Sequence, residues 1–293
     1  MRRATIPAIR AATMTNSHSQ KQQKSEAATL CAAIIGDVHG CLSEAKALMT
    51  KLRAAGFRPE DTLVLLGDLV DKGPDAAGCV RFFRAQADAG QRTVLCMGNH
   101  EEKHARWRRN VARERAGGAQ NAMHDDTGEL AALSDALSAE DLAFLDAAVL
   151  YHRLPWADAL VVHAGLMPNL VDLPSLAVVE TLSRSKRSRL ERVLRLRYWN
   201  VLDERFVPFG EETEVDVFWA ERYDGRHGHV FFGHEPFVNA SAPVQFAHAT
   251  SLDLGCVHGG RLVAAVLVDG QKPSFVSVPA DRVYSPAILG RDE

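Results

Sequence analysis

The sequence predicts an α/β fold with a largely parallel β-sheet, because one pattern occurs three times near its beginning. Each time, a short apolar strand leads into a polar loop that contains glycine, and a segment with helical spacing of apolar residues follows. The strands are expected at 32–35, 62–66 and 92–97, and the helices at about 42–52, 74–89 and 101–115. Consecutive βα units need helical crossovers and therefore favour parallel strands.

One polar position recurs at the end of each of these strands. Asp37, Asp68 and Asn99 follow their strands directly, and successive members of the set are 31 residues apart. In open α/β sheets, ligands bind just beyond the carboxyl ends of the strands. We therefore expect these three side chains to meet in one crevice although they are far apart in sequence.

The remainder of the chain predicts more strands and two insertions. Strands are expected at 159–162, 229–232, 249–254 and 262–268, and helical insertions at about 101–149 and 170–228. Ser138 and Asp141 have the spacing of a capping box at a helix start. The second insertion is strongly basic between residues 183 and 197, and we interpret most of these arginines as a solvated helix face. Residues 31–290 are predicted to form one domain.

Composition excludes several classes of protein. The 293 residues have a formal net charge of −3, which does not indicate a stable nucleic-acid binder, and no apolar run is long enough for a membrane span. The five cysteines show no CxxC spacing, which favours reduced thiols and a cytoplasmic location. Residues 1–30 are basic and nearly free of acids. We expect a disordered tail there. An overlong start, with Met14 as the initiator, and an organellar transit peptide are the alternatives.

Metal-ligand side chains follow five of the predicted strands. A single Gly-Asp or His at a strand end usually reflects turn chemistry, but five such loops together indicate a metal site. Carboxylate, imidazole and amide oxygen without thiolate suit Mn²⁺, Fe or Zn²⁺ in an open site, and we expect two ions, with Mn²⁺ favoured. The candidates are Asp37, His39, Asp68, Asp71, Asn99, His100, His163 and His234.

These loops resemble those of a known family. GDVHG at 36–40, GDLVDKG at 67–73, GNHE at 98–101, HAG at 163–165 and GHEP at 233–236 occur in the order found in calcineurin-like metallophosphoesterases. The resemblance is to the phosphoprotein phosphatase branch, in a bacterial type related to symmetrical dinucleoside tetraphosphatases. It implies a sandwich of two β-sheets flanked by helices, with the metals at the strand ends.

The resemblance also implies a role for each metal-ligand side chain. Asp37 and His39 would bind the first metal, and Asp68 would bridge the two. The second metal would be completed by Asn99, His163 and His234. Two such ions can hold a bridging hydroxide for attack on phosphorus, so that no Ser or Cys nucleophile is needed.

Four further residues are candidates for contact with the substrate or the leaving group. In the family, the His after the ligand Asn is the general acid, which implies this role for His100, oriented by Asp71. Lys72 stands where many members have Arg, so the charge is kept but the bidentate geometry is lost. Arg197 lies in a stretch that resembles a phosphate clamp of the tetraphosphatases.

Two substrate classes remain open. The acid Asp71 favours hydrolysis of phosphomonoesters, including phosphoserine and phosphothreonine in proteins. The segment GCVHGGRL at 255–262 favours the alternative, a symmetrical dinucleoside tetraphosphate hydrolase. A non-catalytic binding module is a more distant alternative, because it predicts missing ligands and none is missing.

Overall fold

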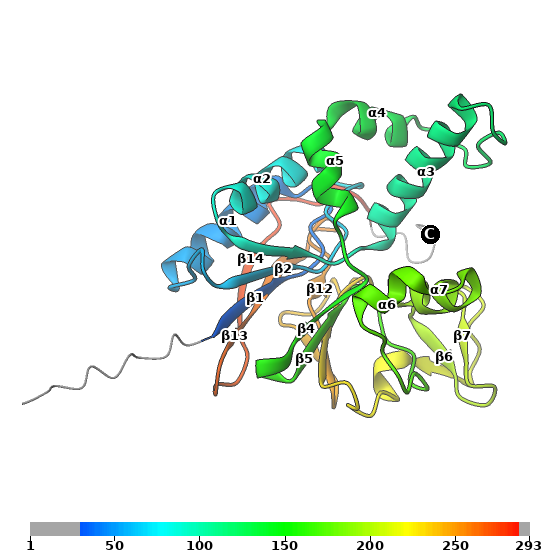
Figure 1. Ribbon diagram of the computed structural model, residues 1–293. Helices are drawn as coiled ribbons and strands as arrows, with labels where there is room; N and C mark the ends of the chain where they lie inside the picture. Colours follow the sequence, from blue (N-terminus) through cyan, green and yellow to red (C-terminus); the bar gives the residue numbers. More distant parts are fainter. Residues whose placement is uncertain (1–29, 287–293) are drawn as a thin grey trace, which may run out of the picture.

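Two β-sheets pack face to face and helices cover their outer faces, as the computed structural model shows in Figure 1. The structure describes residues 30–286. Nearly all of the predicted tail at 1–30, and the last residues of the predicted domain, lie outside the described residues. Among the described residues, no helix is both long and apolar enough to cross a membrane.

The first sheet contains the three repeated βα strands. β1 (Cys31–Ile35), β2 (Thr62–Leu65) and β3 (Arg92–Leu95) are parallel, in the order β1-β2-β3. On the other side of β1 lies the antiparallel β13 (Arg261–Val268), which also pairs with β12 (Asp253–Leu254) and β14 (Ser274–Pro279). The predicted parallel core of the sheet is confirmed.

The second sheet has the order β10-β11-β9-β5-β4. At its centre, β5 (Ala159–Val162), β9 (His229–Phe232) and β11 (Ala249–Ser251) are parallel. The edge strands β4 (Tyr151–Leu154) and β10 (Val244–Gln245) are antiparallel to their neighbours. A short 3₁₀ turn, η1 (Pro155–Ala157), joins β4 to β5.

Alternation along β1 shows how the layers pack. Ala32 and Ile34 face the core between the sheets, whereas Ala33 and Ile35 face the helices. Both faces of the strand are therefore buried, which explains its continuous apolar run. The helical layer over this sheet includes α1 (Leu42–Ala54) and α2 (Ala76–Asp88).

The first insertion is helical, as predicted. α3 (Asn99–Arg115) leads to α4 (Glu129–Ala136) and α5 (Ala139–Asp146). The capping box at the start of α5 is confirmed, since the Asp141 amide donates to Ser138 Oγ at 3.2 Å and the Ser138 amide donates to Asp141 Oδ2 at 3.0 Å. α2 begins later than expected because Asp75 is its N-cap, accepting a hydrogen bond from the Gly78 amide at 2.7 Å.

The second insertion is only partly helical, so that expectation was wrong for its second half. α6 (Leu176–Thr181), α7 (Arg184–Leu190) and the 3₁₀ turn η2 (Glu191–Leu194) come first. A small antiparallel sheet of β6 (Tyr198–Asn200), β7 (Arg205–Val207) and β8 (Asp216–Phe218) follows, before η3 (Trp219–Glu221). Aromatic and β-branched residues there favour strands, but their runs of three are too short to show periodicity.

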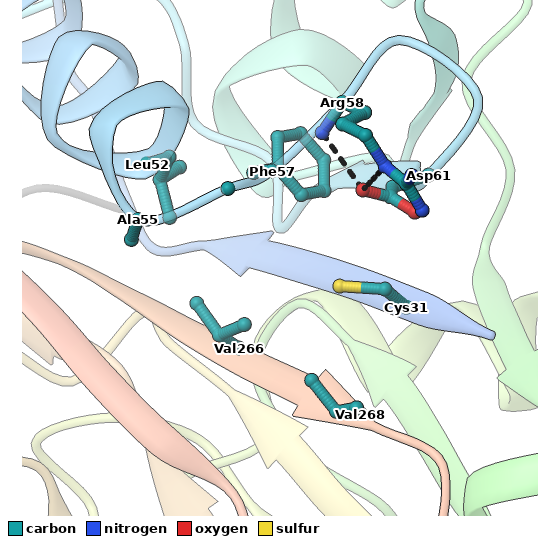
Figure 2. A pocket seen from close by; sticks show the side chains of 9 residues that line it. Cys31, Leu52, Ala55, Phe57, Arg58, Asp61, Val266 and Val268 are labelled. Atoms are coloured by element: carbon teal, nitrogen blue, oxygen red, sulfur yellow. Dashed lines mark hydrogen bonds and ion pairs between the residues drawn. The ribbon is translucent and has the colours of Figure 1, made fainter. Parts of the chain in front are cut away.

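The cysteines are not placed for nucleophilic catalysis. All five are free, and only Cys31 is not fully buried. Cys31 lines a small pocket with Leu52, Phe57 and Val266, shown in Figure 2. This pocket lies at the amino end of β1, opposite the end where Asp37 follows the strand. Burial raises the pKa of the Cys31 thiol further above neutrality.

Ile34 tests the packing of the two sheets. Its side chain is fully buried in the inter-sheet core. We expect Ile34→Ala to lower the free energy of unfolding by about 2–5 kcal/mol, because it removes apolar contacts and leaves a cavity. Urea unfolding measures this change. A loss below about 0.5 kcal/mol, typical of surface positions, would contradict the assigned packing.

Candidate active site

The five predicted loops meet at the carboxyl ends of β1, β2, β3, β5 and β9. The six side chains predicted as metal ligands are buried, and the structure brings them together. We call these six candidates the metal-ligand group: Asp37, His39, Asp68, Asn99, His163 and His234.

Asp68 lies at the centre of this group. Its Oδ2 is 3.4 Å from His39 Nε2 and 3.4 Å from His163 Nε2. Asp68 belongs to two clusters whose ligand atoms lie within 4.8 Å of one another, one with His39 and His100 and the other with His163 and His234. A carboxylate shared by two clusters has the position that a bridging ligand needs.

Hydrogen bonds to backbone carbonyls orient two of the imidazoles. His39 Nδ1 donates to Val70 O at 2.9 Å, and His163 Nδ1 donates to Leu66 O at 3.2 Å. In each ring the other nitrogen, Nε2, is thereby turned toward Asp68. Metal-binding histidines commonly use one nitrogen in this way to fix the tautomer and the direction of the other.

The donor set fits cations. Asp37 Oδ1 is buried and has no hydrogen-bond partner among the described residues. Burial, followed by the charge of Asp253, raises the pKa of Asp37 well above its usual range. Burial would lower the pKa of His163, but the charge of Asp68 and their hydrogen bond raise it to about 9. Excess negative charge in a buried site favours a bound cation.

Asn99 and His234 lie beside His163 in the site. Asn99 Oδ1 lies 2.9 Å from His163 Nε2 and 3.0 Å from His234 Nδ1. The His234 amide donates to Asp37 Oδ2 at 3.0 Å, which links the last ligand loop to the first. The loop can approach this closely because residue 233 is glycine: a Cβ there would lie 2.0 Å from Asp37 Oδ1.

The backbone of the site loops is strained. Seven described non-glycine residues have positive φ, and five of them are in these loops. Each left-handed residue of this kind costs on the order of 1–3 kcal/mol, so the surrounding structure must hold it. The five are His39, Asp68, Asp71, Lys72 and His234, with φ between 43° and 71°.

Glu101 holds the strained loop at Asp68. This buried carboxylate accepts hydrogen bonds from the amides of Asp68 at 2.7 Å, Leu69 at 2.8 Å and Gly98 at 3.0 Å. It therefore joins the loop after β2 to the loop after β3. Glu101 is the last residue of the GNHE motif and lies in the first turn of α3. The sequence alone does not show which groups it would contact.

His100, Asp71 and His104 form a hydrogen-bonded chain. His100 Nδ1 donates to Asp71 Oδ2 at 2.7 Å, and His104 Nε2 donates to Asp71 Oδ1 at 2.6 Å. Burial would raise the pKa of Asp71, but the hydrogen bonds from His100 and His104 hold it far below its usual range. His100 Nε2 points toward the metal-ligand group, 3.9 Å from Asp68 Oδ2.

The two candidate substrate cations are near the site. Lys72 has φ of 64°, and its charge helps burial to lower the pKa of His39 to about 3. Arg197 Nε pairs with Glu235 Oε2 at 2.6 Å, and its Nη2 donates to His234 O at 3.4 Å. The Arg197 guanidinium also lies over the ring of Phe209, 4.7 Å from its centroid.

Three buried polar residues of the site were not identified from the sequence: Glu101, His104 and Asp253. The spacing of His100 and His104, one helical turn apart, was a signal that both could reach one acid. Asp253 accepts from the Gly255 amide at 2.8 Å and raises the pKa of Asp37 through its charge. Nothing in its local sequence indicated that it lies near Asp37.

Comparison with known proteins assigns this constellation to a family. The profile of the calcineurin-like phosphoesterases matches residues 32–270. The chain belongs to this family. It is a metallophosphoesterase by descent, and the predicted resemblance and fold are confirmed.

Relatives of this metallophosphoesterase include a protein phosphatase and dinucleoside tetraphosphatases. Serine/threonine-protein phosphatase 1 of Salmonella typhimurium is 30% identical over 235 residues, covering 79% of this chain and 89% of the relative. An asymmetrical bis(5'-nucleosyl)-tetraphosphatase of Bacillus velezensis is 29% identical over 245 residues, covering 78% and 86%. The crystal structure of a putative diadenosine tetraphosphatase aligns with a TM-score of 0.61 at 28% identity, covering 86% of this chain and 95% of that one.

Glu101→Gln tests the support of the metallophosphoesterase site. Both carboxylate oxygens of Glu101 accept hydrogen bonds from backbone amides. In the Gln variant an NH₂ group replaces one oxygen, so a buried amide loses its acceptor, which costs about 1–3 kcal/mol. We expect a lower melting temperature and weaker metal binding, measured by thermal unfolding and isothermal titration. Glu114→Gln, on the exposed end of the same helix, is the matched control. Equal behaviour of the two variants would contradict the role of Glu101.

Proposed function

We propose that this protein is a dimetal phosphomonoesterase that acts on phosphoserine or phosphothreonine in proteins. The observation that carries this proposal is the hydrogen-bonded chain from His104 through Asp71 to His100, which ends beside the metal-ligand group. A phosphomonoester with an alkyl leaving group needs a proton on the departing oxygen. A histidine held in this way can supply it.

We assign the metal ligands as the sequence predicted. Asp37 and His39 would hold one divalent ion, Asn99, His163 and His234 would hold the other, and Asp68 would contribute to both. Mn²⁺ is favoured over Fe or Zn²⁺ because hard oxygen donors are present in each half. When bound, the two ions supply an activated water nucleophile and neutralise the phosphoryl oxygens. The sharing of Asp68 between two ligand clusters supports this assignment.

The chain's own residues orient the substrate and the proton. Asp71 fixes the His100 ring through Nδ1, so that Nε2 carries the proton that goes to the leaving oxygen. Arg197 is held by Glu235 at the edge of the site, where its guanidinium can meet a phosphoryl oxygen. Lys72 adds a second positive charge, close enough to His39 to lower the pKa of that imidazole.

A dinucleoside tetraphosphate is the second candidate substrate. It is favoured by the tetraphosphatase relatives and by the structural similarity to a putative diadenosine tetraphosphatase. The Asp71–His100 pair supports the monoester instead, because a nucleotide is a better leaving group than an alkoxide and needs a proton donor less. Five free thiols support a reducing, cytoplasmic location.

Asp68→Asn tests the dependence on two metals. The substitution removes the charge from the shared ligand, so we expect turnover to fall to background and bound metal to fall below that of the wild type. Metal content is measured by elemental analysis of purified protein and binding by isothermal titration. Full activity of the wild-type protein after exhaustive chelation would refute metal dependence.

His100→Asn tests the acid. We expect kcat for a phosphoserine peptide to fall about 10²–10⁴-fold with metal content unchanged, and kcat for p-nitrophenyl phosphate to fall much less, since p-nitrophenolate leaves without a proton. Asp71→Asn gives a milder version of the same contrast. Loss of metal, or an equal loss with both substrates, would show that His100 is a ligand or a structural residue.

A direct comparison of substrates decides between the two candidate functions. Wild-type protein with Mn²⁺ is assayed against p-nitrophenyl phosphate, a phosphoserine peptide and diadenosine tetraphosphate. We expect kcat/KM for the phosphopeptide to exceed that for the tetraphosphate. The reverse order would replace the phosphomonoesterase proposal with the tetraphosphatase.

A further inference from the structure

A basic strip runs through α7 and η2. Residues 184–197 contain seven Arg or Lys residues and one acid, in a chain whose formal net charge is −3. Figure 1 shows α7 in the half of the molecule that contains the second sheet. We define the basic strip as the exposed cations of α7 and η2: Arg184, Lys186, Arg187, Arg189 and Arg192.

The strip is fixed to the rim of the metal-ligand group. The segment that carries it contacts three ligand loops, those of His163, Asn99 and His234. η2 follows α7 directly in the chain, so Val193 lies only three residues after the last residue of α7. The contacts are Val193 O with the amides of Ala164 (2.9 Å) and Gly165 (3.3 Å), Arg195 with Glu102 (3.1 Å), and Arg197 with Glu235 (2.6 Å).

Most of the strip's charge is not neutralised by neighbours. Within the described side chains, Arg184, Lys186 and Arg189 have no ion-pair partner, whereas Arg187 pairs with Glu191 at 3.0 Å. Concentrated charge of one sign beside a catalytic site raises the local concentration of oppositely charged ligands. Structural stability does not require such a cluster, since like charges on one short helix repel each other.

The chemistry of the strip fits an acidic polypeptide better than a nucleotide. α7 contains no aromatic residue, whereas proteins that hold unpaired bases generally stack them on aromatic rings. The one aromatic contact of the strip, Arg192 over the Phe206 ring at 5.5 Å, joins residues of the protein itself. Several cations spread over two turns of helix also exceed what a single phosphate can engage.

We propose that the basic strip docks an acidic segment of a protein substrate, next to the phosphorylated residue that enters the metal site. The proposal rests on the phosphomonoesterase function and adds a preference for acidic sequence around the phosphorylation site. The strip binds the flanking Asp and Glu side chains and takes no part in the chemical step. Its effect is on substrate capture and is weakened by salt.

The test uses the full chain with the triple variant Arg184→Gln, Lys186→Gln and Arg189→Gln. Its substrates are a phosphoserine peptide flanked by Asp and Glu, the same peptide with Asn and Gln, and p-nitrophenyl phosphate. At low salt we expect kcat/KM for the acidic peptide to fall about tenfold or more, mainly through KM. The other two substrates should change less than twofold, and 0.5 M NaCl should remove most of the difference.

A matched control carries the same loss of charge elsewhere. Lys46, Arg92 and Arg153 are exposed, and Arg92 begins β3, at the strand end opposite the metal-ligand group. Their triple substitution by Gln should leave the preference for the acidic peptide intact. Fluorescence anisotropy of a labelled, non-phosphorylated acidic peptide measures docking without turnover, and only the strip variant should lose this binding.

The outcomes separate the docking proposal from the proposed function. The docking proposal is overturned if the wild type shows no preference for the acidic peptide, or if the strip variant and the control lose activity equally. In either case, hydrolysis of p-nitrophenyl phosphate and of the neutral phosphopeptide would still support the phosphomonoesterase function. A strip variant that loses only diadenosine tetraphosphate hydrolysis or DNA binding would also overturn the docking proposal. If neither phosphopeptide is a substrate yet the anisotropy signal depends on the strip, docking stands and the proposed function fails.

Discussion

The carboxylate of Asp68 is the constraint on which the rest of the structure depends. It is buried among three imidazoles, and its backbone is in the left-handed region at φ of 49°. A buried charge is costly unless it is paired, and a strained backbone is costly unless it is held. Burial would raise the pKa of Asp68, but the charges of His163 and His100 hold it well below its usual range, so the site keeps a carboxylate ready for a cation.

The two-sheet architecture bears the cost of this arrangement. Five left-handed residues cost about 1–3 kcal/mol each, and their summed cost is comparable to the net free energy of unfolding of a typical domain. Two features offset it. Glu101 satisfies three amides of the strained loops, and the strands that precede these loops are buried on both faces. The precision of the site therefore depends on a core that extends far beyond it.

The sequence predicted the parts of the site that follow directly from strand periodicity. Asp37, Asp68 and Asn99 could be placed together because each ends a recognisable apolar strand, and parallel strands bring their carboxyl ends to one edge. His104, Glu101 and Asp253 could not, because their roles depend on partners in other loops. His104, for example, donates to Asp71, which lies on the loop after another strand.

The small sheet of β6, β7 and β8 could not be predicted from the sequence either, because its strands also depend on contacts between distant segments. Each strand has three residues, so no alternation of apolar and polar positions is visible, and pairing between Tyr198 and Phe218 is settled only in the folded chain. The basic composition before it suggested continued helix. The chain instead turns back so that Arg197 reaches Glu235 and the His234 carbonyl.

Arg197, which we propose as a phosphate-binding residue, is a cation fixed at the site of a protein with a net negative charge. A free guanidinium at the site would be mobile, and one buried without a partner would be costly. Here Glu235 holds its Nε edge at 2.6 Å and Phe209 lies against its face, which fixes the plane of the group. Burial raises the pKa of Glu235 although Arg197 opposes it, so the carboxylate is an incompletely stabilised partner. If Arg197 binds the phosphoryl group as proposed, the substrate would meet a cation that is already oriented. Sharing its ion pair would cost less than ordering a flexible side chain on binding.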